Sequence, residues 1–117
     1  MNQKLWIRYP LPGLNDIIGS ARTHWAKSAK EKKVHTDRVI WTAKSLTPIK
    51  KADFIFTWIE KNRKRDPDNI TAGQKFIFDG LIGAGVLEND GWSQVKSITH
   101  RFEVGQPDGV MVEMIET

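Results

Sequence analysis

Residues 52–60 read Ala-Asp-Phe-Ile-Phe-Thr-Trp-Ile-Glu and form the most strand-like stretch of this chain. Phe54, Phe56 and Trp58 alternate with two isoleucines, so both faces of an extended strand would be apolar. Strands that are apolar on both faces are typical of the interior of a sheet. We therefore expect residues 52–60 to form a central strand that is covered on both sides, by helices or by a partner subunit.

On the N-terminal side of this strand, the pattern predicts one strand and one helix. Residues 4–9 are apolar and β-prone, which predicts a first strand that ends at Pro10. Residues 13–22 read as a turn followed by a loop. Between residues 23 and 46, apolar side chains recur at three- and four-residue spacing, which predicts a helix that Pro48 ends.

On the C-terminal side, a second helix is expected over residues 67–82. Proline is favoured in a first helical turn, and Gly83 follows the last apolar position. Gly73 inside this helix costs about 1 kcal/mol relative to alanine, so we expect a backbone or a bulky ring to approach closely there. Residues 94–104 alternate in polarity, and together with residues 110–115 they predict a C-terminal hairpin.

The resulting order β-α-β-α-β-β predicts a single α+β domain over residues 1–117. Its mixed sheet would have about four strands, with two helices on one face. The chain has no cysteine, which excludes disulfides and thiolate zinc sites. Residues 1–6 contain no apolar signal segment, and no stretch approaches the roughly 20 apolar residues of a membrane span. We therefore expect a cytoplasmic protein with no membrane partner.

The charge pattern is consistent with a polyanionic partner. Eighteen lysines and arginines against 14 acids give a net charge of +4, which permits such a partner without requiring one. Cations dominate residues 22–65, and acids crowd residues 66–90. A phosphodiester-cleaving enzyme needs both, because cations hold phosphates and carboxylates hold metal. The cations that we expect to contact DNA, unless they simply form a solvated surface, are Lys27, Lys30, Lys61, Arg63, Lys64 and Arg65.

The stretch Arg65-Asp66-Pro67-Asp68-Asn69 places two carboxylates two residues apart. Carboxylates this close repel each other unless a cation lies between them, and a divalent metal ion would meet that need. An aspartate before proline is also an ordinary helix N-cap, and the two interpretations are compatible. Asp90 is either a turn residue or a third oxygen ligand that the fold returns to the helix start, with Glu88 as a spare candidate.

Lys75 follows Asp68 by seven residues, which is two helical turns, so we expect both on the same side of one helix. Two interpretations remain open for its ammonium group. It forms a surface ion pair with Asp79, or it stabilises the phosphate in a reaction. No metal-ligand spacing joins the three histidines, which are His24, His35 and His100.

Three segments in this order resemble the RusA family of Holliday-junction resolvases: Arg65–Asn69, Lys75–Leu81 and Ala84–Asp90. A fourth segment, Pro10–Asn15, fits more loosely, so the resemblance spans nearly the whole chain. Members of that family are small homodimers that cut four-way DNA junctions with Mg²⁺ or Mn²⁺.

The resemblance implies roles for individual side chains. Asp66, Asp68 and Asp90 would be the metal-binding catalytic carboxylates, and Lys75 a catalytic lysine. The chain departs from the family pattern in two places. Its link between the paired aspartates and Lys75 is longer, and it has Asn89-Asp90 where members tend to have two acids.

The sequence therefore predicts a metal-dependent, structure-selective DNA endonuclease that acts in recombination and repair. Its cofactor would be Mg²⁺ or Mn²⁺, and its partners would be branched DNA and a second copy of the chain. One alternative is a non-catalytic nucleic-acid-binding module in which Asp66 is only an N-cap. Another is a metal-dependent phosphohydrolase that acts on small nucleotides.

Overall fold

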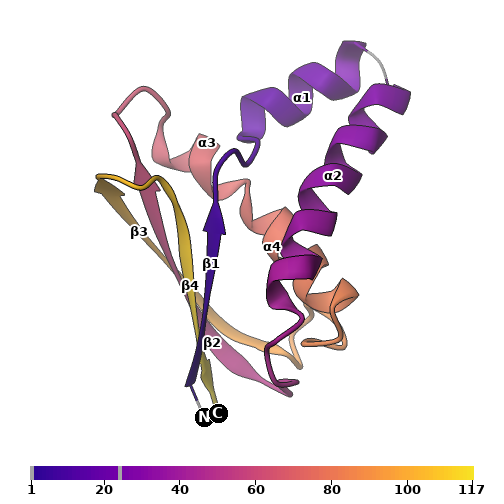
Figure 1. The fold of residues 1–117 in the computed structure, drawn as a ribbon, viewed down its shortest axis with the longest axis vertical. Coiled ribbons are helices and arrows are strands. Elements are labelled where there is room, and N and C mark those ends of the chain that lie inside the picture. The colour runs from indigo at the N-terminus through magenta and orange to yellow at the C-terminus, as the bar shows by residue number, and fades with distance from the viewer. Residues whose placement is uncertain (1, 24) are drawn as a thin grey trace.

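The computed structural model describes residues 2–23 and 25–117, apart from the side chains of residues 20–28. In chain order its elements are β1 (Asn2–Arg8), α1 (Leu14–Thr23), α2 (Trp25–Ala43), β2 (Ala52–Glu60), α3 (Pro67–Thr71), α4 (Gln74–Gly83), β3 (Val95–Val104) and β4 (Gly109–Glu116). The strands form one mixed sheet in the order β1-β4-β2-β3, and the helices lie on one face of it (Figure 1). The expected α+β fold class is confirmed.

Strand β2 is central, as its apolar pattern predicts. It pairs antiparallel with β4 on one side and parallel with β3 on the other. Phe54, Phe56 and Trp58 point toward the helices and are fully buried. Ile55 and Ile59 point to the opposite face and are only half-buried. The described helices all pack on one side of the sheet, as the predicted arrangement with helices on one face requires, and coverage of the other face by a partner subunit stays a prediction.

The expected C-terminal hairpin is wrong, because β4 does not pair with β3. Strand β4 lies between β1 and β2 and runs antiparallel to both. Its inward residues Val110, Val112 and Met114 are fully buried, and its two edges are paired with β1 and β2. Strand β3 has mostly exposed residues and forms the outer edge next to β2.

Residues 14–23 form α1, where the sequence predicts a turn and a loop. Two side-chain contacts hold the start of this helix. The carboxylate of Asp16 accepts a hydrogen bond from the Gly13 backbone N–H at 3.0 Å, as in one half of a capping box. The side-chain oxygen of Asn69 accepts another from the Asn15 N–H at 2.9 Å. The second contact comes from 54 residues away, so local sequence does not reveal it.

The predicted helix over residues 67–82 is divided into α3 and α4. The backbone N–H of Gly73 bonds to the Ile70 carbonyl, and the N–H of Phe76 bonds to the Gly73 carbonyl. These hydrogen bonds join residues three apart, as in a 3₁₀-helix, where an α-helix would join residues four apart. A Cβ on Gly73 would lie 3.2 Å from the Trp58 ring. The close approach of a bulky ring that Gly73 predicts is therefore confirmed.

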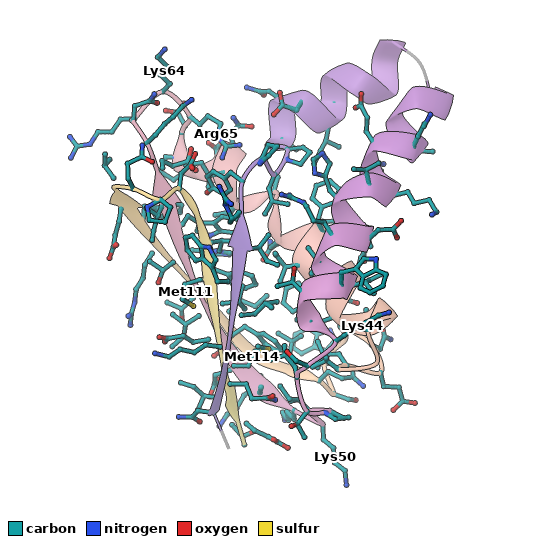
Figure 2. All side chains as sticks on the ribbon, viewed as in Figure 1. Lys44, Lys50, Lys64, Arg65, Met111 and Met114 are labelled. Atoms are coloured by element: carbon teal, nitrogen blue, oxygen red, sulfur yellow. The ribbon has the colours of Figure 1, made fainter. Side chains whose placement is uncertain are left out.

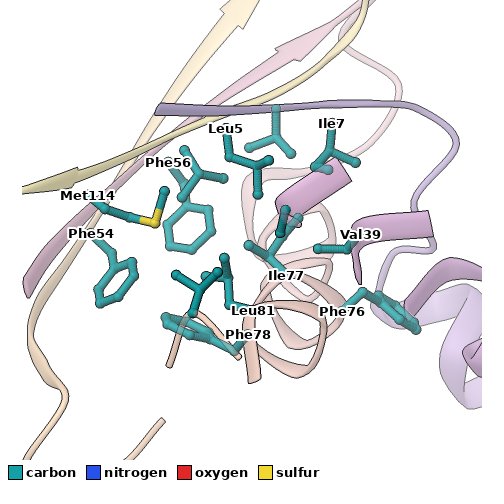
Figure 3. Packing of buried hydrophobic residues seen from close by; sticks show 14 of the residues in the cluster. Leu5, Ile7, Val39, Phe54, Phe56, Phe76, Ile77, Phe78, Leu81 and Met114 are labelled. Atoms are coloured by element: carbon teal, nitrogen blue, oxygen red, sulfur yellow. The ribbon is translucent and has the colours of Figure 1, made fainter. Parts of the chain in front are cut away.

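The core lies between the sheet and the pair α2–α4 (Figure 3). Phe54 and Phe56 meet Phe78 edge-on, with ring centroids 5.1 and 5.8 Å apart. Helix α4 approaches α2 closely through glycine. A Cβ built on Gly80 would lie 2.3 Å from Cγ1 of Val39, which is itself fully buried. Side chains larger than hydrogen at position 80 would therefore push the two helices apart.

We expect Gly80→Ala to lower the free energy of unfolding by about 1–3 kcal/mol, since the added methyl overpacks the α2–α4 contact. Urea denaturation followed by circular dichroism measures the change. The control is Gly19→Ala in α1, where an added Cβ has no described atom within 4 Å. Alanine should stabilise that helix by up to about 1 kcal/mol. Equal effects of the two substitutions would contradict close packing at Gly80.

Candidate nucleic-acid and metal site

The paired carboxylates lie at the start of α3, and both are exposed. Asp66 occupies the N-cap position with extended backbone angles, φ −77° and ψ 153°. Its backbone carbonyl accepts bonds from the N–H groups of Asn69 and Ile70. Its side chain makes no capping hydrogen bond within the described part of α3. The Asp66 carboxylate is thus left uncommitted, whereas an N-cap aspartate normally uses it to bind a helix N–H.

Asp66 borders a cavity of about 340 Å³, which we call the Asp66 cavity. Two sets of residues form its walls. The 60–67 segment and α3 supply one wall, and the end of β3 supplies the other through Phe102, Glu103 and Val104. Arg63 also lines the cavity and is exposed. Asp66 and the C-terminal end of the sheet-edge strand therefore border the same cavity, with a cation beside them.

An ion pair between Glu60 and Arg65 fixes the segment that leads to Asp66. Nε and Nη2 of Arg65 each donate to one oxygen of the Glu60 carboxylate, both at 2.9 Å. The remaining nitrogen, Nη1, donates to the backbone carbonyl of Leu11 at 3.1 Å. The guanidinium also lies 5.3 Å from the centre of the Tyr9 ring. One side chain thus ties the end of β2 to the segment that follows β1.

The protonation of this pair follows from its surroundings. Burial acts to raise the pKa of Glu60, but the hydrogen bonds and the charge of Arg65 outweigh it and hold that pKa below its ordinary value. The same hydrogen bonds raise the pKa of Arg65. Burial, with the Glu60 carboxylate nearby, raises the pKa of the Tyr9 phenol. Both members of the pair are therefore charged at neutral pH.

The expected DNA-contacting cations fall into two groups. Lys30, Lys61, Arg63 and Lys64 are exposed, and Lys64 projects from one end of the molecule, opposite Lys50 (Figure 2). Arg65 is different, because its guanidinium is engaged by Glu60 and Leu11. Arg65 therefore stabilises the fold, and its guanidinium is not open to contact a phosphate. The side chain of Lys27 lies outside the described residues, as does His24.

Lys75 forms the surface ion pair that its spacing predicts. Its ammonium lies 3.3 Å from a carboxylate oxygen of Asp79, one turn further along α4. The expectation that Lys75 and Asp68 share one side of a continuous helix is wrong, because the chain breaks between α3 and α4. The side chain of Lys75 remains mostly exposed, and its catalytic role stays a prediction of the resemblance alone.

Asp90 lies at the opposite end of the molecule from Asp66. It belongs to the turn before β3, where the carbonyl of Gly91 accepts the N–H of Val95. Val95 pairs with Ala52 at the start of β2, whereas Val104 pairs with Glu60 at its end. The length of β3 therefore separates the two aspartates by roughly 30 Å. The expected return of Asp90, or of its neighbour Glu88, to the helix start does not occur within one chain.

The residues of one chain do not complete a three-carboxylate metal site. In the ranges 2–23 and 25–117, no group of three or more histidine, aspartate or glutamate side chains is placed to hold an ion. Asp66 and Asp68 supply two oxygen-bearing groups, and Mg²⁺ in proteins uses one or two carboxylates together with water and phosphate. The pair fits part of such a site. The third ligand implied by the resemblance is missing from it.

Two residues at this site are not identified by their sequence pattern. Glu60 lies on the same inward face as the alternate buried residues of β2, so the alternation places its carboxylate at the edge of the core. That placement is the one signal that predicts a buried partner such as Arg65. Asn69 looks like part of the acidic motif, but its side chain binds the start of α1. No local signal indicates that second contact.

The two described histidines, His35 and His100, act as ring partners in this fold. Nε1 of Trp58 donates to Nδ1 of His100 at 2.9 Å, which satisfies the indole N–H inside the sheet. Burial lowers the pKa of His100, so the ring accepts this bond as a neutral imidazole. His35 meets Phe76 edge-on at 5.6 Å.

No family model matches this chain, and a search of curated proteins finds no match for it.

We expect Glu60→Gln to destabilise the protein by about 2–3 kcal/mol at pH 7, because it leaves the half-buried Arg65 without its counter-charge. The pair stabilises the fold fully above the ordinary carboxyl pKa of 4.5. That stabilisation falls below this pH and disappears as the pH drops through the lowered pKa. Denaturant titrations at pH 7 and at about pH 3–4 should therefore give a deficit that shrinks with acid.

The matched control is Asp37→Asn. Asp37 forms an exposed ion pair with Lys33 on α2 at 3.1 Å, so its removal should cost about 0.5 kcal/mol or less. A Glu60→Gln deficit as small as this, or one that grows on acidification, would rule out the ion pair as a stabilising tie.

Proposed function

We propose that this chain is a metal-dependent DNA endonuclease of the RusA type, which resolves four-way junctions by cutting paired strands. The observation that carries the proposal is the uncommitted carboxylate of Asp66. It sits beside exposed Asp68, at the start of the segment that most resembles that family. A divalent cation would supply activation of the attacking water and stabilisation of the leaving oxygen in such an enzyme.

The arrangement of charge around Asp66 supports a phosphodiester substrate. Arg63 shares the Asp66 cavity, and Lys61 and Lys64 extend from the same loop. Cations beside a carboxylate pair can hold phosphates without reading base sequence. These side chains bind and orient the backbone of DNA, while Arg65 keeps the loop in place from inside.

A non-catalytic nucleic-acid-binding module is the second candidate. It accounts for the cations, and it assigns Asp66 the ordinary role of an N-cap. The absence of a capping bond from the Asp66 side chain to the described helix α3 weighs against it. A phosphohydrolase of small nucleotides is a third candidate, which would turn over mononucleotides and ignore DNA.

Branched DNA and a second copy of the chain are the proposed partners. A four-way junction has approximate two-fold symmetry, so a two-fold dimer would present equivalent sites to two strands. A membrane is not among these partners. None of the helices within residues 2–23 and 25–117 has the length and apolarity to cross a bilayer.

We expect Asp66→Asn and Asp68→Asn each to reduce junction cleavage at least ~100-fold in Mg²⁺, because each removes a proposed metal ligand. Junction binding should be unchanged or tighter, since each substitution removes a negative charge near phosphate. Cleavage of a labelled synthetic four-way junction and a gel-shift titration measure the two effects.

Asp37→Asn removes the same charge from the surface of α2 and serves as the control. It should leave cleavage unchanged. A wild-type protein that shifts the junction and never nicks it would favour the binding module. Full cleavage by either variant at position 66 or 68 would remove that residue from the site.

Replacing Lys61, Arg63 or Lys64 with glutamine should weaken junction binding by a similar factor for every DNA sequence. Removing one phosphate contact reduces the steepness of log affinity against log salt by about 1. Lys50→Gln is the control, because Lys50 projects from the opposite end of the molecule (Figure 2). Equal slopes for the loop variants and Lys50→Gln would show that this loop does not contact DNA.

A further inference from the structure

A second cavity shares a wall with the Asp66 cavity. It holds about 530 Å³, and we call it the Tyr9 cavity. Glu60, Asn62 and Arg65 line both cavities, so the segment that carries the Glu60–Arg65 ion pair separates them. The remaining wall comes from the chain that follows β1, from α2 and from the turn before β4. A ligand in the Tyr9 cavity would therefore lie next to the paired carboxylates without touching them.

The size and lining of the Tyr9 cavity suit a small aromatic ligand. Sites for small ligands commonly hold about 300–1,000 Å³ and have apolar walls with a few polar groups. Here the apolar wall is the run Tyr9–Pro12, in which Leu11 is buried. Nucleobases stack on aromatic side chains such as that of Tyr9, and this stacking tolerates every base. The apolar part of the wall thus fits a planar ring.

Two buried polar atoms of this wall have no hydrogen-bond partner among the described residues. They are the Tyr9 hydroxyl and Nδ1 of His35. The hydroxyl lies near the Glu60 carboxylate, but Arg65 already donates to both oxygens of that carboxylate. Both atoms lie behind the cavity surface, so each ring must turn slightly to reach a ligand. A ligand with its own donors and acceptors would remove the cost of leaving them unpaired.

The protonation state of His35 suits an uncharged ligand group. Burial lowers the pKa of this histidine, and the nearby charge of Arg38 acts in the same direction. The imidazole is therefore neutral at pH 7, and its Nδ1 either accepts or donates a hydrogen bond. Nucleobases offer both kinds of partner.

The charged side chains of the wall indicate how a nucleotide would lie. Lys61 and Lys64 are exposed, and Lys64 projects from this end of the molecule (Figure 2). Their ammonium groups attract a phosphate. Asp16 and Asp108 add carboxylates, which repel a phosphate and accept hydrogen bonds from the N–H groups of a base. The phosphate therefore belongs at the lysines, and the base belongs against the rest of the wall.

We propose that the Tyr9 cavity binds one nucleotide, whose base enters the cavity and whose phosphate lies at Lys61 and Lys64. An unpaired nucleotide of bound DNA and a free mononucleotide share this chemistry. The first source rests on the function proposed above. Because the two cavities share a wall, a DNA strand with one phosphate at the Asp66 cavity would place a neighbouring nucleotide at the Tyr9 cavity.

Such a site would favour branched DNA over intact duplex. Drawing a base out of a duplex costs stacking and pairing energy, and this cost is least where the base is already unpaired. Bases at a branch point meet that condition most readily. The Tyr9 cavity would therefore fill at a branch and rarely elsewhere, without reading the base sequence.

The test uses 5-iodouracil, a base that cross-links to nearby aromatic side chains under ultraviolet light. It is placed at the branch point of a four-way junction, in the middle of a duplex, or in free 5-iodo-deoxyuridine monophosphate. The full-length protein is irradiated with each in metal-free buffer, so that no cleavage is required, and mass spectrometry of peptides locates the links. We expect links at Tyr9 or His35 from the junction and far fewer from the duplex. Trp41 is the control for surface photochemistry, because it is 72% exposed and lies outside the cavity wall.

Two variants test the unpaired polar atoms. Tyr9→Phe and His35→Phe each remove one of these atoms and keep an aromatic ring. Each should weaken binding of the cross-linking nucleotide about 2–10-fold, the effect of losing one hydrogen bond, without lowering stability in urea. Lys50→Gln is the control, because Lys50 projects from the opposite end of the molecule. Binding by both variants that equals wild-type binding would overturn the proposal.

The cross-links decide both the cavity and the source of its nucleotide. A link at Tyr9 or His35 from the branch-point base supports the cavity as part of a DNA site. A link from the free nucleotide alone, displaced by other deoxynucleoside monophosphates and not by inorganic phosphate, supports it as a mononucleotide site. Links from neither source, or a yield at Trp41 as high as at Tyr9, overturn the proposal. A wild type that cuts no junction in Mg²⁺ overturns the proposed function, and the cross-links still decide the cavity.

Discussion

The ion pair between Glu60 and Arg65 is the constraint on which the site depends. It joins the end of the central strand to the segment after β1, and it does so one residue before Asp66. A charged pair that is only partly reached by water costs desolvation energy, so it persists because three hydrogen bonds from Arg65 satisfy it. The direction in which the chain enters α3, and hence the exposure of the carboxylates, follows from this tie.

Helix packing sets the second constraint. Gly73 lies against Trp58 and Gly80 against Val39, so α4 approaches both the sheet and α2 where side chains are smallest. The break between α3 and α4 separates Pro67–Thr71 from the helix that makes these contacts. Asp66 at the N-cap of this short helix and Asp68 in its first turn are exposed, while Ile70 is buried in the core.

The sequence predicts the elements of this fold that depend on local patterns, but not the features that depend on contacts between distant segments. The apolar run at 52–60 specifies a central strand, and the spacing at 23–46 specifies a helix, because both signals are local. The position of β4 between β1 and β2 is not local, since it depends on which inward faces must be buried. The start of α1 is likewise held by Asn69 from a distant helix. At the candidate site, the paired aspartates and the Lys75–Asp79 pair are readable from spacing, but the distance to Asp90 depends on the direction of a whole strand.

That distance has a mechanical consequence. Strand β3 pairs with β2 along its whole length, so it acts as a strut that keeps the Asp66 and Asp90 ends of the chain about 30 Å apart. A movement within one chain that brought these two carboxylates together would have to break that pairing, so the two ends present separate charged surfaces to their surroundings.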